Sequence, residues 1–261
     1  MAKDIRIEED TLGKVEIPAV ALWGPQTERS RNNFPTGSYI PLEIIKALLQ
    51  IKKAAAQSNE KEGQLPQEKT QPIIKAVDSL LDLSDEKLRA DFPLKVYQTG
   101  SGTQTNMNVN EVVAHLATKL GDGTEILPND DVNRGQSSND IFPTAMNMTA
   151  SVAVLDLEKA VSHLIDELKV KQEKYWQVVK VGRTHLQDAT PLTFGQEVSG
   201  WVSMLEHDLA YLKKLDDTLL EFPMGGTAVG TGLNADPHFA ADIAEKVSEI
   251  YGMKFNADTN K

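Results

Sequence analysis

The sequence has no cysteine among its 261 residues. Disulfides and cysteine-ligated iron–sulfur clusters are therefore excluded within this chain. It also lacks any apolar run of the ~18 residues that a membrane span needs. The first six residues lack the apolar core of a signal peptide. Together these absences predict a soluble, cytoplasmic protein.

Metal-binding and phosphate-binding patterns are missing as well. No group of His, Asp and Glu residues has convincing metal-ligand spacing, so we expect no metal. The glycine-rich residues 225–232 lack the following lysine of a P-loop, which argues against nucleotide binding. The net charge of −11 argues against nucleic acid as a partner. An anionic substrate would have to be held by local hydrogen-bond donors rather than by the overall field.

Apolar spacing predicts a mainly α fold. After 40 residues of loops and short strands, with one strand at residues 15–20, helical spacing covers residues 41–62, 67–83 and 105–120. A long heptad-like stripe follows Ser138, a second long helix starts at Pro191, and a third runs from Asp236 to about Tyr251. We expect a small N-terminal α-rich domain with short strands at residues 1–137. Residues 138–261 would form the first part of a central helical bundle.

Three polar islands interrupt this pattern, at residues 100–111, 128–140 and 182–191. The first two lead directly into apolar-periodic runs, which places them at helix N-termini. Exposed N–H groups and the helix dipole make such places anion sites. Ordinary capping is the alternative interpretation, with Ser138, Ser101 or Thr103 as N-caps. Three islands so rich in amides and hydroxyls favour one shared anion-binding pocket.

The third island contains His185. Thr190 suits an N-cap and Pro191 suits the first helical position, so we expect His185 on a short connector that enters a helix. An imidazole can move a proton near neutral pH. Local capping by this histidine is the alternative.

The chain resembles class II fumarate hydratase, of the fumarase/aspartase superfamily. The resemblance runs from about Arg6 to the last residue and rests on several motifs. Within the superfamily, His185 and residues 101–104 favour a fumarase over an aspartase. The matching segments are residues 6–13, 23–27, 100–111, 129–147, 182–196 and 225–232.

This resemblance implies reversible hydration of fumarate to (S)-malate in the tricarboxylic acid cycle, through proton abstraction and an enediolate-type intermediate. It implies no cofactor, and a homotetramer whose active sites each draw on three chains. His185 would be the catalytic proton donor and acceptor. The implied substrate-binding residues are Ser101, Gly102, Thr103, Ser137, Ser138, Asn139 and Thr184.

One family motif has no counterpart here. The flexible loop Gly-Ser-Ser-x-Met-Pro-x-Lys-x-Asn-Pro, which in the family supplies a serine base, does not occur in these 261 residues. We therefore expect the N-terminal part of a fumarase, with an incomplete active site. Two alternatives remain open: an enzyme of the aspartate ammonia-lyase type, and an inactive helical assembly fragment.

The resemblance also implies an accessory anion site. Many bacterial members read His-Pro-Asn-Asp there, with an arginine three residues before the histidine. This chain reads Leu127, Pro128, Asn129 and Asp130, with Thr124 at the arginine position. We expect this degenerate site to bind dicarboxylates poorly.

Overall fold

The computed structural model describes residues 4–261. Residues 1–3 belong to the N-terminal segment in which we expect no signal peptide, and they lie outside the described residues. The chain divides into two compact units. The first comprises the described residues up to 149 together with residues 220–261, and the second comprises residues 150–219. The expected domain boundary at residue 137 stays a prediction.

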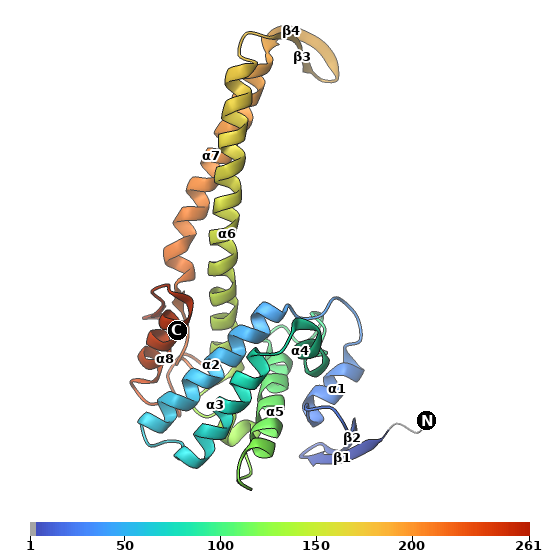
Figure 1. The fold of residues 1–261 in the computed structure, drawn as a ribbon, viewed down its shortest axis with the longest axis vertical. Helices are drawn as coiled ribbons and strands as arrows, with labels where there is room; N and C mark the ends of the chain where they lie inside the picture. Colours follow the sequence, from blue (N-terminus) through green and yellow to red (C-terminus); the bar gives the residue numbers. More distant parts are fainter. Residues whose placement is uncertain (1–3) are drawn as a thin grey trace. The chain divides into compact units, whose positions relative to one another are not determined.

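The first unit begins with an antiparallel hairpin of β1 (Ile5–Asp10) and β2 (Gly13–Pro18), which confirms a strand near residues 15–20. The short helix α1 (Pro25–Asn33) follows. Helices α2 (Leu42–Lys61), α3 (Gln67–Leu81) and α5 (Thr103–Leu120) pack side by side, as Figure 1 shows. The short helix α4 (Asp85–Asp91) lies between α3 and α5 in the sequence. The predicted helices at 41–62, 67–83 and 105–120 are confirmed within the usual uncertainty of helix ends.

The rest of this unit comes from the middle and the end of the sequence. A single π-helical turn, η1 (Pro128–Val132), precedes the start of α6 (Ser138–Lys174). After residue 219 the chain forms β5 (Glu221–Phe222), α8 (Phe239–Tyr251) and β6 (Asn256–Ala257), and β5 pairs with β6 in parallel. Helix α8 packs on α2.

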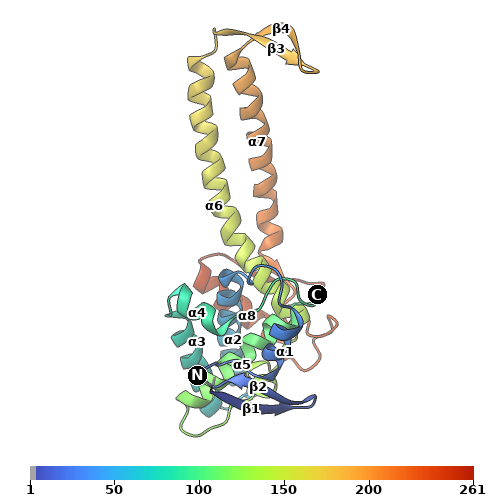
Figure 2. The same cartoon turned by 90° about the vertical axis from the view of Figure 1, so that its right-hand side faces the viewer.

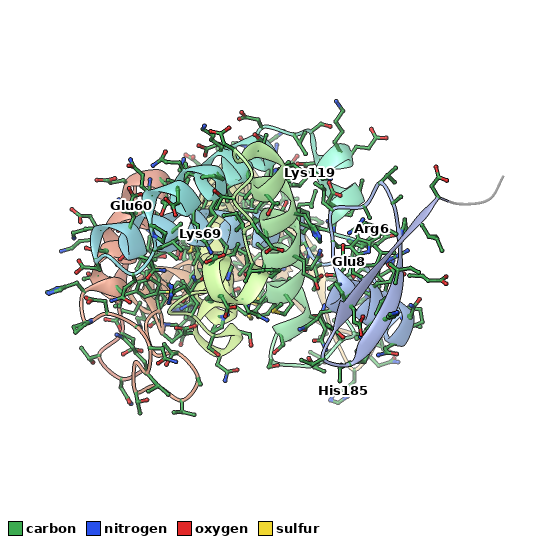
Figure 3. The ribbon with its side chains drawn as sticks, turned by 90° about the horizontal axis from the view of Figure 1, so that it is seen from below. Arg6, Glu8, Glu60, Lys69, Lys119 and His185 are labelled. Atoms are coloured by element: carbon green, nitrogen blue, oxygen red, sulfur yellow. The ribbon has the colours of Figure 1, made fainter. Side chains whose placement is uncertain are left out.

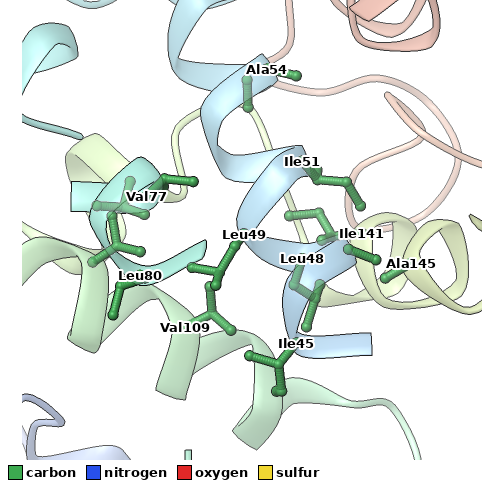
Figure 4. Close-up of a cluster of buried hydrophobic side chains, with 14 of the residues drawn as sticks. Ile45, Leu48, Leu49, Ile51, Ala54, Val77, Leu80, Val109, Ile141 and Ala145 are labelled. Atoms are coloured by element: carbon green, nitrogen blue, oxygen red, sulfur yellow. The ribbon is translucent and has the colours of Figure 1, made fainter. Parts of the chain in front are cut away.

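The core of this unit is aliphatic. Helix α2 supplies its centre, because apolar side chains on nearly all its faces meet α3, α5, α8 or the start of α6. Figure 4 shows the part where α2, α3, α5 and α6 meet. Its fully buried side chains include Ile45, Leu48, Leu49, Ile51, Val77, Leu80, Val109, Ile141 and Ala145.

Helix α1 is not apparent from apolar spacing, because its nine residues contain no large apolar side chain. Its N-terminus is capped from a distant part of the chain. The carboxylate of Glu111, on α5, accepts hydrogen bonds from the backbone N–H groups of Gly24, Gln26 and Thr27 (2.9, 2.8 and 3.1 Å) and from the Thr27 hydroxyl (2.6 Å). A Cβ on Gly24 would lie 2.9 Å from this carboxylate, so the close approach requires glycine.

The second unit is an antiparallel helical hairpin. Residues 150–174 of α6 run beside α7 (Phe194–Leu219), and the hairpin of β3 (Val179–Thr184) and β4 (Gln187–Thr193) connects them (Figure 2). Its apolar cluster consists of Ile165, Val198 and Val202.

Many other apolar side chains of this unit are exposed, including Leu157, Leu164, Trp201, Met204 and Tyr211. A helix pair with so wide an apolar surface needs further partners to bury it.

The expected helix start at Thr190 and Pro191 is wrong. Both residues lie in β4, and α7 begins at Phe194. A threonine followed by proline also fits a strand at a sheet edge, because an edge residue whose N–H faces solvent makes no hydrogen bond to a neighbouring strand. The pairing of β3 with β4 decides between the two structures.

Candidate active site

The polar turn at residues 137–140 begins α6. The hydroxyl of Ser137 accepts a hydrogen bond from the backbone N–H of Asn139 (3.2 Å), and Asp140 Oδ1 accepts one from the N–H of Ser137 (2.9 Å). These reciprocal bonds form a capping box, in which an aspartate takes the usual place of glutamate or glutamine. The N-cap is therefore Ser137, and the expected capping role of Ser138 is wrong. The hydroxyl of Ser138 is left for other contacts.

The first polar island begins α5. Gly102 occupies the N-cap position at a φ of +70°, so the capping roles considered for Ser101 and Thr103 are wrong. The side-chain oxygen of Gln98 instead accepts hydrogen bonds from the backbone N–H and the hydroxyl of Thr105, in the first turn of α5 (3.1 and 3.0 Å). A Cβ on Gly102 would overlap the ring of Phe142, on α6, which leaves glycine as the residue that fits. This contact brings the starts of α5 and α6 together.

Three hydroxyls meet where these two helices begin. Thr103 Oγ1 lies 2.9 Å from Ser101 Oγ and 2.9 Å from Ser138 Oγ. Ser101 is exposed, whereas Thr103 and Ser138 are half-buried. Hydroxyl groups donate hydrogen bonds to anions, and the free N–H groups of two helix starts add positive potential. The cluster of Ser101, Thr103 and Ser138 can therefore bind a carboxylate.

Asn139 lies beside this hydroxyl cluster on an exposed part of the turn. Its Nδ2 donates a hydrogen bond to the carbonyl oxygen of Ala228 (2.8 Å), which belongs to the glycine-rich residues 225–232. One N–H and the side-chain oxygen of Asn139 remain for other partners. Sequence reasoning gave this glycine-rich loop no role, and its composition alone carries no signal for one.

Thr184 and His185 belong to the second unit. Thr184 pairs with Gln187 across the β3–β4 hairpin, so His185 and Leu186 form its two-residue turn. Both turn residues have positive φ, +46° and +61°, as in a type I′ turn, which strongly favours Asn and Gly. Thr184 and His185 are exposed, and the turn holds the imidazole on a short, defined loop of the second unit. The expected helix entry at this place is replaced by a hairpin.

The degenerate accessory segment lies at η1. Residues 127–129 line an open cleft of about 550 Å³ in the first unit, together with α5 and the β1–β2 hairpin. The cleft contains His115 and Lys119, but five carboxylates also line it: Glu8, Glu9, Asp10, Glu111 and Glu125. Figure 3 labels Glu8, Lys119 and Arg6, which forms an ion pair with Glu8 at 2.6 Å. This excess of negative charge opposes the binding of a dicarboxylate, and poor binding at this segment stays a prediction.

Asp130 is not among the residues that line this acidic cleft. It lines a second cleft, of about 640 Å³, with Ser137 and Thr227.

Within residues 4–261, no group of three or more His, Asp or Glu side chains is placed to hold a metal ion. No helix in the same range is long and apolar enough to cross a membrane.

A family model described as lyase matches residues 13–261 of this chain. The chain is 47% identical over 272 residues to a fumarate hydratase class II of Myxococcus xanthus, a match that covers 99% of this chain and 56% of that protein. It is 50% identical over 259 residues to a fumarate hydratase class II of Listeria monocytogenes, covering 98% and 56% of the two proteins.

Solved structures give the same result. The class II fumarase of Schistosoma mansoni matches with a TM-score of 0.88 and 38% identity, covering 99% of this chain and 58% of that one. The chain therefore spans about half the length of the relatives that it matches.

Proposed function

The chain belongs to this lyase family, and from that premise we propose that it forms part of a class II fumarate hydratase that interconverts fumarate and (S)-malate. The observation that carries the proposal is the hydroxyl cluster of Ser101, Thr103 and Ser138 at two helix starts. The identity of about half to relatives named fumarate hydratase class II supports it.

Fumarate hydration needs two kinds of group. In the reverse direction, a base removes a proton from the carbon beside one carboxylate of malate, and negative charge grows on that carboxylate. Donors fixed in advance stabilise such charge better than mobile ones. Ser101, Thr103, Ser137, Ser138, Asn139 and the N–H groups around Gly102 would hold the carboxylates, and Thr184 would add a donor.

His185 would handle the second half of the reaction. Its imidazole would protonate the leaving hydroxyl of malate, or activate the water that adds to fumarate. The serine base that the family resemblance implies belongs to a loop with no counterpart in these residues. We therefore propose that the site works only when a further polypeptide segment supplies that loop.

The exposed apolar side chains of α6 and α7 support assembly with further copies of the chain. We propose a homotetramer in which this surface is buried, in a cytoplasmic enzyme of the tricarboxylic acid cycle with no nucleic acid or membrane partner. For the 261 residues alone we expect a weak oligomer or aggregation. Light scattering that finds a stable monomer would contradict this expectation.

The same surface favours one second candidate, an inactive helical assembly fragment. The two candidates differ in whether His185 has a chemical role. The test is hydration of fumarate, measured as the loss of its absorbance at 240 nm. The assay is run with and without a second polypeptide, which comprises the part of the Listeria monocytogenes relative that this chain does not match. We expect activity only in the mixture.

Replacing His185 by Asn should lower that activity about 10²- to 10⁴-fold, the usual contribution of a general acid or base. His163→Asn, on the exposed surface of α6, is the matched control and should leave the activity unchanged. Equal activity in both variants would refute the role of His185. Activity of the 261 residues alone would refute the requirement for the missing loop.

A further inference from the structure

The turn that carries Ser137, Ser138 and Asn139 is held by a buried carboxylate. Asp140 is 1% exposed, and its two oxygens each accept a backbone hydrogen bond of 2.9 Å, one from Ser137 and one from Thr227. Thr227 lies 87 residues further along the chain. A single side chain therefore ties the start of α6 to the glycine-rich loop at residues 225–232.

The hydrogen bond between Asp140 and Thr227 also affects Asn139, whose side-chain amide is a candidate substrate-binding group. Ala228 directly follows Thr227, and its carbonyl oxygen accepts the hydrogen bond from Asn139 Nδ2. With that carbonyl fixed, the amide of Asn139 has one defined orientation. Asp140 thus acts on Asn139 twice, once through the capping box and once through the loop.

A buried lysine holds the other side of the turn. Lys52, on α2, is fully buried, and its Nζ donates hydrogen bonds to Asn133 Oδ1 and Gln136 Oε1, both at 2.9 Å. Because both amides point their oxygens at Lys52, the NH₂ group of Gln136 is free to donate to the carbonyls of Val132 and Arg134, each at 3.0 Å. Lys52 thereby fixes the backbone that leads into Ser137.

This arrangement is costly for a purely structural element. Burial lowers the pKa of Lys52 well below its usual value, and the charge of Asp140 only partly opposes this shift. Burial also raises the pKa of Asp140. Thr227 is β-branched and has a φ of +57°, a strained conformation for such a residue. Buried ionic groups of this kind add little stability compared with apolar side chains of the same size.

We propose that Asp140 and Lys52 are positioning residues, which lock the Ser137–Asn139 turn and the 225–232 loop into the conformation that binds a substrate carboxylate. The proposal rests on the proposed function for the identity of the ligand. Both side chains are buried, so they act through the turn rather than through direct contact with a ligand. Their role is to remove the cost of ordering the donors when the anion binds, which is the general advantage of preorganisation.

The first test is amide hydrogen exchange on the 261-residue chain, with Asp140→Asn. An asparagine can accept only one of the two backbone hydrogen bonds. We expect exchange at Ser137 or Thr227 to accelerate about 10- to 100-fold relative to the amides of α3, the effect of losing one charge-assisted hydrogen bond.

Asp242→Asn is the matched control, because Asp242 is also a buried aspartate of the first unit but binds Ser58 and Lys61. It should accelerate neither amide relative to α3. Unchanged exchange at both amides in Asp140→Asn, or equal acceleration in the control, would overturn the proposal. If Asp140→Asn does not fold, Gln136→Leu removes the contact with Lys52 at a half-buried position and should accelerate exchange at Ser137.

The second test separates positioning from general stability. In the complemented hydration assay, Lys52→Met should raise KM for fumarate about tenfold or more and change kcat less than about threefold, because a disordered turn weakens binding in the ground and transition states alike. Lys53→Met, next to it on α2, loses an ion pair with Asp78 and should change neither constant. An unchanged KM in Lys52→Met overturns the proposal. If the unmodified mixture does not hydrate fumarate, the proposed function fails, and the exchange experiment alone decides the positioning roles.

Discussion

The two units of this molecule bury their apolar side chains in opposite ways. In the unit of residues 4–149 and 220–261, helices α2, α3, α5 and α8 surround one continuous core. In the unit of residues 150–219, the buried apolar cluster is limited to Ile165, Val198 and Val202. The first unit has what an independent domain needs, whereas the second is a pair of long helices with most of its apolar stripe facing outward.

Polar side chains follow the same division. The first unit contains buried charged groups with several hydrogen bonds each, among them Lys52, Glu111, Asp140 and Asp242. In the second unit, the ion pair of Lys169 with Glu206 is exposed and that of Lys180 with Glu197 is partly exposed. Residue for residue, substitutions in the first unit should therefore change the stability of a single chain more than those in the second.

The largest expected effect is in the core. Leu48→Ala, at a fully buried position of α2, should lower the free energy of unfolding by about 2–5 kcal/mol through lost burial and a cavity. Leu164→Ala, at a 47% exposed position of α6, should change it by less than about 1 kcal/mol. Urea unfolding of both variants measures the difference. Equal losses would mean that the outer stripe of α6 is already buried in the sample.

A smaller effect is expected for the carboxylate that caps α1. Burial raises the pKa of Glu111, against the lowering effect of its four hydrogen bonds. Glu111→Gln replaces one accepting oxygen by an NH₂ group and should cost about 1–3 kcal/mol. Glu197→Gln breaks a partly exposed ion pair with Lys180 in the second unit and should cost about 0–1 kcal/mol. Chemical denaturation compares the two, and a reversed order would refute this role of Glu111.

Acid should weaken the first unit through Asp242. Its hydrogen bond with Lys61 holds the pKa of this carboxyl below its usual value of 3.8, so the ionised form stabilises the fold above that pH. The contribution disappears as the pH falls through the lowered pKa. At pH 7, Asp242→Asn should lower Tm by roughly 2–4 °C, and this difference should shrink progressively below pH 3.8. A difference that persists undiminished well below that pH would contradict the linkage.

The smallest effect should be a gain of stability in the second unit. Leu186 has a φ of +61° and is 97% exposed, so Leu186→Gly relieves backbone strain without losing packing. We expect the β3–β4 hairpin to gain about 0.5–1 kcal/mol, seen as exchange of its amides about two- to fivefold slower. Thr184→Gly, at a strand position outside the turn, is the control and should accelerate exchange.

Much of the helical architecture follows from apolar spacing. The patterns at residues 41–62, 67–83 and 105–120 predict α2, α3 and α5 because one face of each helix meets the core. Helices α1 and α4 were missed because they are short, and α1 carries no apolar stripe at all. Contacts with residues far away in the sequence stabilise α1, and the spacing of residues within α1 does not predict such contacts.

The candidate site was predictable to a similar extent. Ser101, Thr103 and Ser138 meet at two helix starts, as the polar islands suggested. The sequence predicts a helix entry where His185 lies in a hairpin, because Thr190 and Pro191 fit both structures. Lys52 and Asp140 were not found, since a lysine in a helical run and an aspartate after a cap look like ordinary surface residues until the fold buries them.

The cap of α1 has a consequence for the order in which the chain is made. Helix α1 is synthesised early, but the carboxylate that satisfies its first N–H groups belongs to residue 111. On the ribosome, α1 has no such partner until α5 has emerged, and a nine-residue helix without an apolar stripe has little stability of its own. Helix α1 is therefore completed only after the α5 segment, and until then it stays open to proteases or chaperones.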